Sequence, residues 1–261
     1  MDIKVGFVPT MGALHQGHLA LIKEAKKTAD IVVSSIFVNP KQFDKKEDLD
    51  KYPRQEEKDI ALLKQAGCDI VYIPDENDIY SNTFKNIDLD IAHLEKIYEG
   101  EKRKGHFDGV VQVLYQLFDI VKPHKVFFGQ KDYQQCLVVK SIIKTYFQQI
   151  EMVTCPTIRN VDGLALSSRN QRLSEKGLER ASYLNKGLNL AITLYERFVP
   201  QQALAFAKTY LENNHIEVEY IDFADADTLK SFGECKETPQ NKIIIVAACI
   251  EGVRLIDNML F

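Results

Sequence analysis

The sequence has 261 residues, of which 45% are hydrophobic and 27% are charged, and this balance excludes a disordered or collagen-like chain. The 33 Lys and Arg residues against 37 Asp and Glu give a formal charge of -4, without the basic excess that binding to a nucleic-acid backbone requires. We therefore expect a folded globular protein with no nucleic-acid partner.

Cysteine usage and the N-terminus point to a reducing compartment. The five cysteines, at positions 68, 136, 155, 235 and 249, are an odd number and include no close pair. This spacing predicts neither a disulfide framework nor a zinc clip. The first residues show no basic segment leading into an apolar run, and the longest apolar runs are too short to cross a bilayer. We expect a cytoplasmic protein with no membrane partner.

In the first 169 residues, short apolar runs alternate with longer amphipathic stretches, a pattern typical of βα units around a parallel sheet. Strands rich in β-branched and aromatic residues are expected at 5–8, 31–38, 70–73, 125–128 and 151–158. Helices are expected at 18–29, 56–66 and 109–121, with Gly67 ending the second of these.

The pattern changes after residue 169. Two helical stretches follow, at 174–197 and 200–213, with Ser174 and Pro200 as start signals. Strands are expected at 218–223, 243–249 and 253–256, the last two joined by Glu251 and Gly252 as a hairpin. We predict an α/β fold: a Rossmann-like parallel sheet domain over residues 1–169 and a smaller α+β domain over residues 170–261.

Residues 9–18, with the sequence PTMGALHQGH, lie between the first expected strand and the first expected helix. In an open α/β sheet, ligands bind beyond the carboxyl ends of the strands, where this turn lies. Its two glycines permit close backbone approach, the start of the helix supplies unpaired N–H groups, and the i, i+3 spacing of His15 and His18 directs both rings the same way. The turn suits a polyphosphate, although an isolated pair of histidines is also compatible with a plain surface turn.

Residues 15–18, HQGH, resemble the HxGH signature of the nucleotidyltransferase superfamily. Further segments narrow the resemblance: SIFVNPKQF at 35–43, GHFDGV at 105–110, FGQKDYQQ at 128–135, DGLALSSRN at 162–170 and RLIDN at 254–258. With them, nearly the whole chain resembles the pantothenate synthetase family. The resemblance implies an ATP-dependent ligase that condenses pantoate with β-alanine through a pantoyl adenylate and releases AMP and pyrophosphate.

The resemblance also implies which residues bind the substrates. It places ATP on four segments, namely Met11, Gly12, Ala13, Leu14, His15, Gln16, Gly17 and His18; Gly129, Gln130, Lys131 and Asp132; Ile158; and Leu166, Ser167, Ser168 and Arg169. It implies catalytic roles for His18, His15 and Lys131, which would stabilise negative charge on the phosphates. Gln42 and Gln135 match the positions that bind the pantoate and β-alanine substrates.

Several assignments have two interpretations. Asp132 is a candidate for holding either ribose or Mg²⁺, the family's metal. Phe43, Val110 and Val113 are candidates for an apolar wall around pantoate, or for plain core. The charged run from Asp44 to Asp59 is either a mobile lid or a solvated surface segment. No residue stands out as the base for the β-alanine amine.

The resemblance further implies a homodimer formed through the N-terminal domain, with the C-terminal domain as a cover over ATP. Relatives usually carry a helical segment before the first strand, and we expect its loss to affect one sheet edge rather than the ATP site. Two rival functions remain: a nucleotidyltransferase that releases a nucleotidylated product, and a nucleotide-binding regulatory protein without turnover.

Overall fold

The computed structural model describes residues 3–44, 46–81, 84 and 86–261. The chain forms two compact units. Residues up to Gln130 together with Gln134–Pro156 make the first unit, and Lys131–Tyr133 together with Thr157–Phe261 make the second. The domain boundary predicted after residue 169 therefore falls within the second unit, and it stays a prediction.

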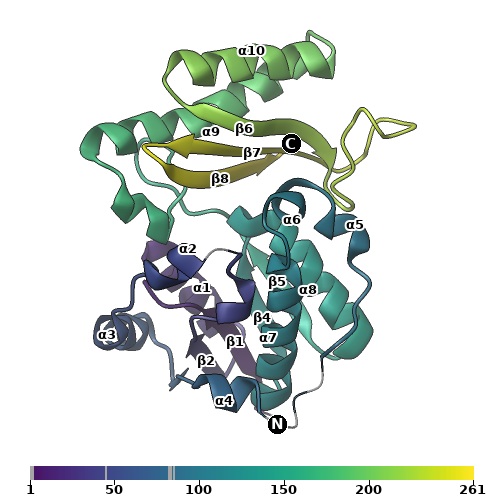
Figure 1. Ribbon diagram of the computed structural model, residues 1–261. Helices are drawn as coiled ribbons and strands as arrows, with labels where there is room; N and C mark the ends of the chain where they lie inside the picture. The colour runs from purple at the N-terminus through teal and green to yellow at the C-terminus, as the bar shows by residue number, and fades with distance from the viewer. Residues whose placement is uncertain (1–2, 45, 82–83, 85) are drawn as a thin grey trace. The chain divides into compact units, whose positions relative to one another are not determined.

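A five-stranded parallel sheet forms the centre of the first unit, as predicted (Figure 1). Its strands are β1 (Val5–Thr10), β2 (Ile31–Ile36), β3 (Ile70–Tyr72), β4 (Lys125–Gly129) and β5 (Glu151–Cys155). They lie in the order β3-β2-β1-β4-β5. Because the sheet grows in one direction from β1 to β3 and in the other from β4 to β5, its topological switch point lies between β1 and β4. Ligands of such sheets bind beyond the carboxyl ends of the strands at that point.

Helices cover both faces of this sheet. Val8 packs in one cluster with Ile22 and Leu63, whereas its neighbour Phe7 meets Phe118 edge to face, with ring centroids 6.3 Å apart. Since successive strand residues face opposite sides, the helices that carry Ile22 and Leu63 lie on one face and the helix of Phe118 on the other. The helical elements up to residue 156 are α1 (Gln16–Lys26), η1 (Pro40–Gln42), α2 (Lys46–Asp50), α3 (Glu56–Ala66), α4 (Glu76–Ile79), α5 (Ala92–Glu95), α6 (Tyr98–Lys102), α7 (His106–Val121), η2 (Gln130–Asp132) and α8 (Tyr133–Tyr146).

Two differences from the sequence prediction have local physical causes. The strand expected at 151–158 ends at Cys155, because Pro156 has no N–H to donate to a neighbouring strand. Helix α8 was not predicted. Its Val138-Val139 and Ile142-Ile143 pairs are β-branched, a composition that favours strands, and their burial in the unit outweighs that preference.

The second unit contains a three-stranded antiparallel sheet in the order β6-β7-β8. Its strands are β6 (Glu217–Asp225), β7 (Lys242–Ile250) and β8 (Val253–Leu260), and its helices are η3 (Ser168–Arg172), α9 (Glu175–Tyr195) and α10 (Pro200–Asn213). Leu188, Leu211 and Phe223 are fully buried where α9 and α10 pack on this sheet (Figure 1). The predicted hairpin is present, since Glu251 and Gly252 both have positive φ, at 52° and 73°. None of the described helices combines the length and the apolar character needed to cross a membrane.

Candidate functional site

The two histidines lie at the start of α1, directly after β1. His15 is the N-cap, and its Nδ1 accepts the N–H of Gly17 at 3.1 Å. Nδ1 of His18 accepts the N–H of His15 at 3.3 Å, and the ring centroids are 4.1 Å apart. The rings therefore lie side by side, as their spacing predicts. A neutral imidazole whose Nδ1 accepts a hydrogen bond carries its proton on Nε2, so each ring has an Nε2–H donor.

The backbone N–H groups of residues 13, 14, 17 and 18 are paired inside the protein, which differs from the unpaired donors that the sequence led us to expect here. The N–H groups of Ala13 and Leu14 donate to Oδ2 and Oδ1 of Asp59, both at 2.8 Å. That of Gly17 donates to His15 instead. Because these peptide donors are used inside the protein, the imidazoles are the groups from this loop best suited to donate to an anion.

Gln42 lies beside the loop that precedes the histidines. It ends η1, after β2, and is 7% exposed. Its Nε2 lies 2.9 Å from Sδ of Met11, and its Oε1 accepts a hydrogen bond from Nδ2 of Asn39 at 3.1 Å. Thioether sulfur is only a weak acceptor. The Nε2 donor of Gln42 is thus available to a stronger acceptor, such as a ligand oxygen.

Asn39 orients Gln42, a role that the sequence alone did not suggest. Its Nδ2 also donates to the carbonyl of Gly109 at 3.0 Å, and its Oδ1 accepts from the hydroxyl of Tyr80 at 2.7 Å. Burial raises the pKa of Tyr80, so the phenol stays protonated and can donate to this oxygen. The backbone N–H of Lys41 donates to the same oxygen at 3.2 Å, and this leaves the amide nitrogen of Asn39 facing Gln42. The available sequence signal was an Asn before Pro40, a pair typical of turns.

Segments that follow three neighbouring strands meet at one edge of the sheet. Strands β2, β1 and β4 are adjacent and parallel, so their carboxyl ends lie at the same edge. Gln42 follows β2, the histidine loop follows β1, and Gly129 and Gln130 end β4 and begin η2. Gln135, half-buried in the first turn of α8, follows the same strand. The first unit thus gathers most of its predicted site residues at one edge.

Lys131 packs with the second unit, although it follows β4 in the sequence. Nδ2 of Asn258 donates to the carbonyl of Lys131 at 2.8 Å, and Nζ of Lys131 lies 3.7 Å from Oδ1 of Asp132. Asn258 follows Asp257, whose carboxylate accepts two hydrogen bonds from Arg159 at 2.6 and 2.9 Å. The end of β8 therefore holds the backbone of Lys131.

The remaining predicted ATP residues also belong to the second unit. The N–H of Leu166 donates to the carbonyl of Ile158 at 2.9 Å, and the side chain of Ile158 is 38% exposed. Ser167 is the N-cap of η3, and its Oγ accepts the N–H of Arg169 at 3.2 Å. Ser168 and Arg169 are half-buried. Their shared role with the histidines in holding a nucleotide stays a prediction.

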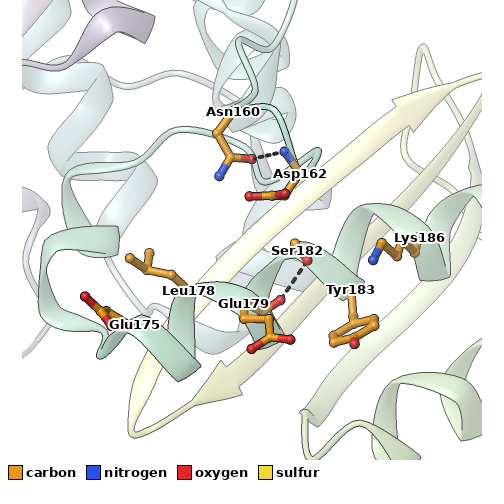
Figure 2. A pocket seen from close by; sticks show the side chains of 8 residues that line it. All are labelled: Asn160, Asp162, Glu175, Leu178, Glu179, Ser182, Tyr183 and Lys186. Atoms are coloured by element: carbon orange, nitrogen blue, oxygen red, sulfur yellow. Dashed lines mark hydrogen bonds between the residues drawn. The ribbon is translucent and has the colours of Figure 1, made fainter.

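A separate pocket of about 420 Å³ lies in the second unit (Figure 2). Its lining residues are Asn160, Asp162, Glu175, Leu178, Glu179, Ser182, Tyr183 and Lys186. Three carboxylates against one ammonium give the pocket a charge that repels a polyphosphate. Residues predicted to bind ATP do not line it. This pocket is therefore not the predicted nucleotide site.

Comparison with known proteins gives consistent results. The family model described as pantoate-beta-alanine ligase matches residues 1–260. Pantothenate synthetase from Cytophaga hutchinsonii is 46% identical over 263 residues, covering 98% of this chain and 90% of the relative. The crystal structure of pantothenate synthetase from Thermus thermophilus has a TM-score of 0.91 at 38% identity, covering 98% of this chain and 92% of that one. Pantoate-beta-alanine ligase from Francisella tularensis, solved with beta-gamma ATP and beta-alanine, has a TM-score of 0.79 at 36% identity. The match covers 99% of this chain and 90% of that one.

Proposed function

This chain belongs to the pantoate-beta-alanine ligase family, and from that premise we propose how its residues carry out the reaction. It is an ATP-dependent ligase that condenses pantoate with β-alanine to pantothenate through a pantoyl adenylate, releasing pyrophosphate and AMP. The match over residues 1–260 carries this conclusion. The assignment of roles to individual residues, the metal and the oligomeric state are our proposals.

In the first step, a carboxylate oxygen of pantoate attacks the α-phosphorus of ATP, and the bond to the oxygen of pyrophosphate breaks. Negative charge grows on the departing pyrophosphate. We assign its stabilisation to the Nε2–H donors of His15 and His18, together with the ammonium of Lys131. A preorganised donor of this kind lowers a barrier by roughly 3 to 4 kcal/mol. The contacts at Nδ1 support this assignment, because they leave Nε2 as the donor on each ring.

Pantoate would be held by Gln42 and Gln135, whose amides donate to its hydroxyl and carboxylate oxygens. Gln42 would exchange the sulfur of Met11 for a ligand oxygen, a stronger acceptor. Val110 and Val113 are 3% and 5% exposed. This burial suits core residues and an apolar wall for the methyl groups of pantoate equally well.

In the second step, the neutral amine of β-alanine attacks the acyl carbon of the adenylate and forms the C–N bond. The bond from that carbon to the phosphate oxygen breaks, AMP leaves, and the amine gives up one proton to water. We assign no protein base to this step. Positioning of the amine against the activated carbonyl supplies a large part of such an acceleration, and exclusion of water protects the adenylate from hydrolysis.

Magnesium would arrive with the nucleotide. In the part of the chain that the structure describes, no group of three or more His, Cys, Asp or Glu is arranged to hold a metal ion. Mg²⁺ bound to ATP needs no such cage, because phosphate oxygens and water supply most of its ligands. Asp132, whose side chain is 52% exposed, fits the remaining carboxylate ligand. When bound, the ion would neutralise charge on the phosphates.

We also propose a cytoplasmic homodimer. The thiols of Cys68, Cys155, Cys235 and Cys249 are compatible with a reducing compartment. The dimer rests on the family resemblance. Light scattering coupled to size-exclusion chromatography tests it, and a mass near the 29.8 kDa of one chain would contradict it.

The decisive assay combines ATP, pantoate and β-alanine. AMP formation that depends on both acids supports the ligase. A stable nucleotidylated product without AMP would instead support a nucleotidyltransferase. Tight ATP binding with no pyrophosphate release would support a regulatory protein.

Substitution of His18 tests the residue roles. His18→Ala should slow the first step about a hundredfold or more, the effect of losing one electrostatic contact, while ATP binding changes less. Lys23→Ala is the control, because Lys23 is exposed on the same helix α1. Near-normal turnover in both His18→Ala and Lys131→Ala would remove the assignment.

A further inference from the structure

Asp59 is a buried carboxylate that neither the reaction nor the family resemblance has used. It lies in the first turn of α3 and is 1% exposed. Each of its oxygens accepts one peptide N–H, from Ala13 to Oδ2 and from Leu14 to Oδ1, both at 2.8 Å. A charge-assisted pair of this kind is among the stronger hydrogen-bonding arrangements in proteins. It connects α3 to the loop that precedes the histidines.

The loop has an unusual backbone at this contact. Gly12 and Ala13 both have positive φ, at 76° and 51°, and the left-handed region is uncommon for a residue with a side chain. A Cβ at Gly12 would lie 2.9 Å from Oδ2 of Asp59 and 3.2 Å from Cγ2 of Ile36. The backbone thus approaches the carboxylate more closely than a side chain at position 12 permits.

Two successive N–H groups that point in one direction form a concave anion site. In a phosphate-binding loop such a site receives the ligand, whereas here Asp59 fills it. Leu14 directly precedes His15, the N-cap of α1. The carboxylate therefore fixes the point where α1 begins, and with it the directions of both imidazoles.

We propose that Asp59 is a positioning residue for the nucleotide-activating step, an inference that rests on the proposed function. Its carboxylate holds residues 12–14 so that His15 and His18 are oriented toward the phosphates before ATP binds. It also keeps the N–H groups of Ala13 and Leu14 away from the nucleotide. The donors that reach the phosphates from this loop are then imidazoles rather than peptides.

The test compares Asp59→Asn with Phe118→Leu. Asparagine keeps the size of Asp59 but has one accepting oxygen, so its NH₂ group faces the second peptide N–H. Phe118 is fully buried on the opposite face of the sheet, against Phe7. Its substitution lowers stability without touching the histidine loop. Both variants are measured for thermal midpoint, for the rate of pyrophosphate release from ATP and pantoate, and for amide hydrogen exchange.

Asp59→Asn should release pyrophosphate about ten- to a hundredfold more slowly, the scale of a misplaced catalytic group, with the KM for pantoate unchanged. Phe118→Leu should retain the parent rate even at an equal loss of thermal midpoint. The amide hydrogens of Ala13 and Leu14 should exchange about tenfold faster in Asp59→Asn alone, as expected for a lost hydrogen bond.

A parent-like rate in folded Asp59→Asn, or an equal loss of rate in Phe118→Leu, would overturn the proposal. Should Asp59→Asn fail to fold, Asp59→Glu keeps the charge but displaces the carboxylate by one methylene, and the same loss of rate is expected. If the parent protein releases no pyrophosphate, the proposed function fails instead. The amide exchange rates of Ala13 and Leu14 then still show whether Asp59 holds the loop. If these rates are the same in Asp59→Asn as in the parent protein, the positioning role of Asp59 is refuted.

Discussion

Removing one partner of the buried pair formed by Arg159 and Asp257 should destabilise the second unit. Asp257 has a side chain that is 2% exposed, against 21% for Arg159. The guanidinium donates two hydrogen bonds to the carboxylate, at 2.6 and 2.9 Å. It donates two more to the carbonyls of Gly163 and Asn258, at 3.1 and 3.2 Å. Arg159→Met keeps much of the apolar stem and removes every one of these donors.

The expected loss of stability in Arg159→Met follows from the interactions that Asp257 keeps. Without the guanidinium, the N–H of Asn258 at 2.8 Å still donates to Asp257, but the carboxylate has lost its cation. Removing one partner of a buried ion pair costs about 3 to 5 kcal/mol. Because Arg159 is one-fifth exposed, some water already reaches the pair, and we expect a loss near the lower end, about 3 kcal/mol.

Urea unfolding followed by circular dichroism measures this loss as a fall in midpoint at unchanged slope. Lys208→Met is the matched control, since Lys208 forms an exposed pair with Glu212 at 3.8 Å and should cost no more than about 0.5 kcal/mol. Adding Asp257→Leu to Arg159→Met should recover most of the loss, because the stranded charge is gone. A loss below about 1 kcal/mol in Arg159→Met, or a double variant no better than the single one, would refute this reasoning.

Two further substitutions test the site and the pH dependence. In Gly109→Ala, the new Cβ would lie 2.3 Å from the carbonyl oxygen of Lys41 and 2.7 Å from the nitrogen of Gln42. The substitution should therefore displace Gln42 and raise the KM for pantoate more than the KM for ATP. Equal changes in the two KM values would contradict this prediction. The N–H of Val32 and the ammonium of Lys26 lower the pKa of Asp69 from its ordinary 3.8, so its charge stabilises the fold above that pH and the contribution is lost as the pH falls through the lowered value. Asp69→Asn should therefore melt below the parent at neutral pH, with a gap that closes in strong acid; a gap independent of pH in thermal melts would rule out this origin.

Most of the sheet could be predicted from sequence because its central strands are buried on both faces. Such strands lack the polar face of an amphipathic helix, as in 31–36, where four of six residues are Ile or Val and five are buried. Helix α10 begins and ends at the predicted residues, Pro200 and Asn213, because proline at the first helical position is a strong local signal. Helix α8 could not be predicted in this way, because its β-branched pairs resemble a strand and only their packing in the folded unit favours the helix.

Asp59 shows why part of the site could not be predicted from short sequence patterns. It ends a charged run that was interpreted as a lid or a solvated segment, yet it is 1% exposed. Its partner N–H groups lie 46 and 45 residues earlier in the chain. Only the fold brings α3 to the loop after β1. The same holds for Asn39 and Tyr80, whose hydrogen bond joins residues 41 positions apart.

Because Lys131–Tyr133 pack with the second unit while residues on both sides belong to the first, no single cut of the chain yields two complete halves. A fragment that begins at Thr157 leaves the amide of Asn258 and the carbonyl of Ala226 without the partners they have in Lys131 and Tyr133. Independent expression of the C-terminal half would therefore call for a graft of this tripeptide. In evolution, exchange of that part between relatives would have to preserve a match with three residues that precede β5.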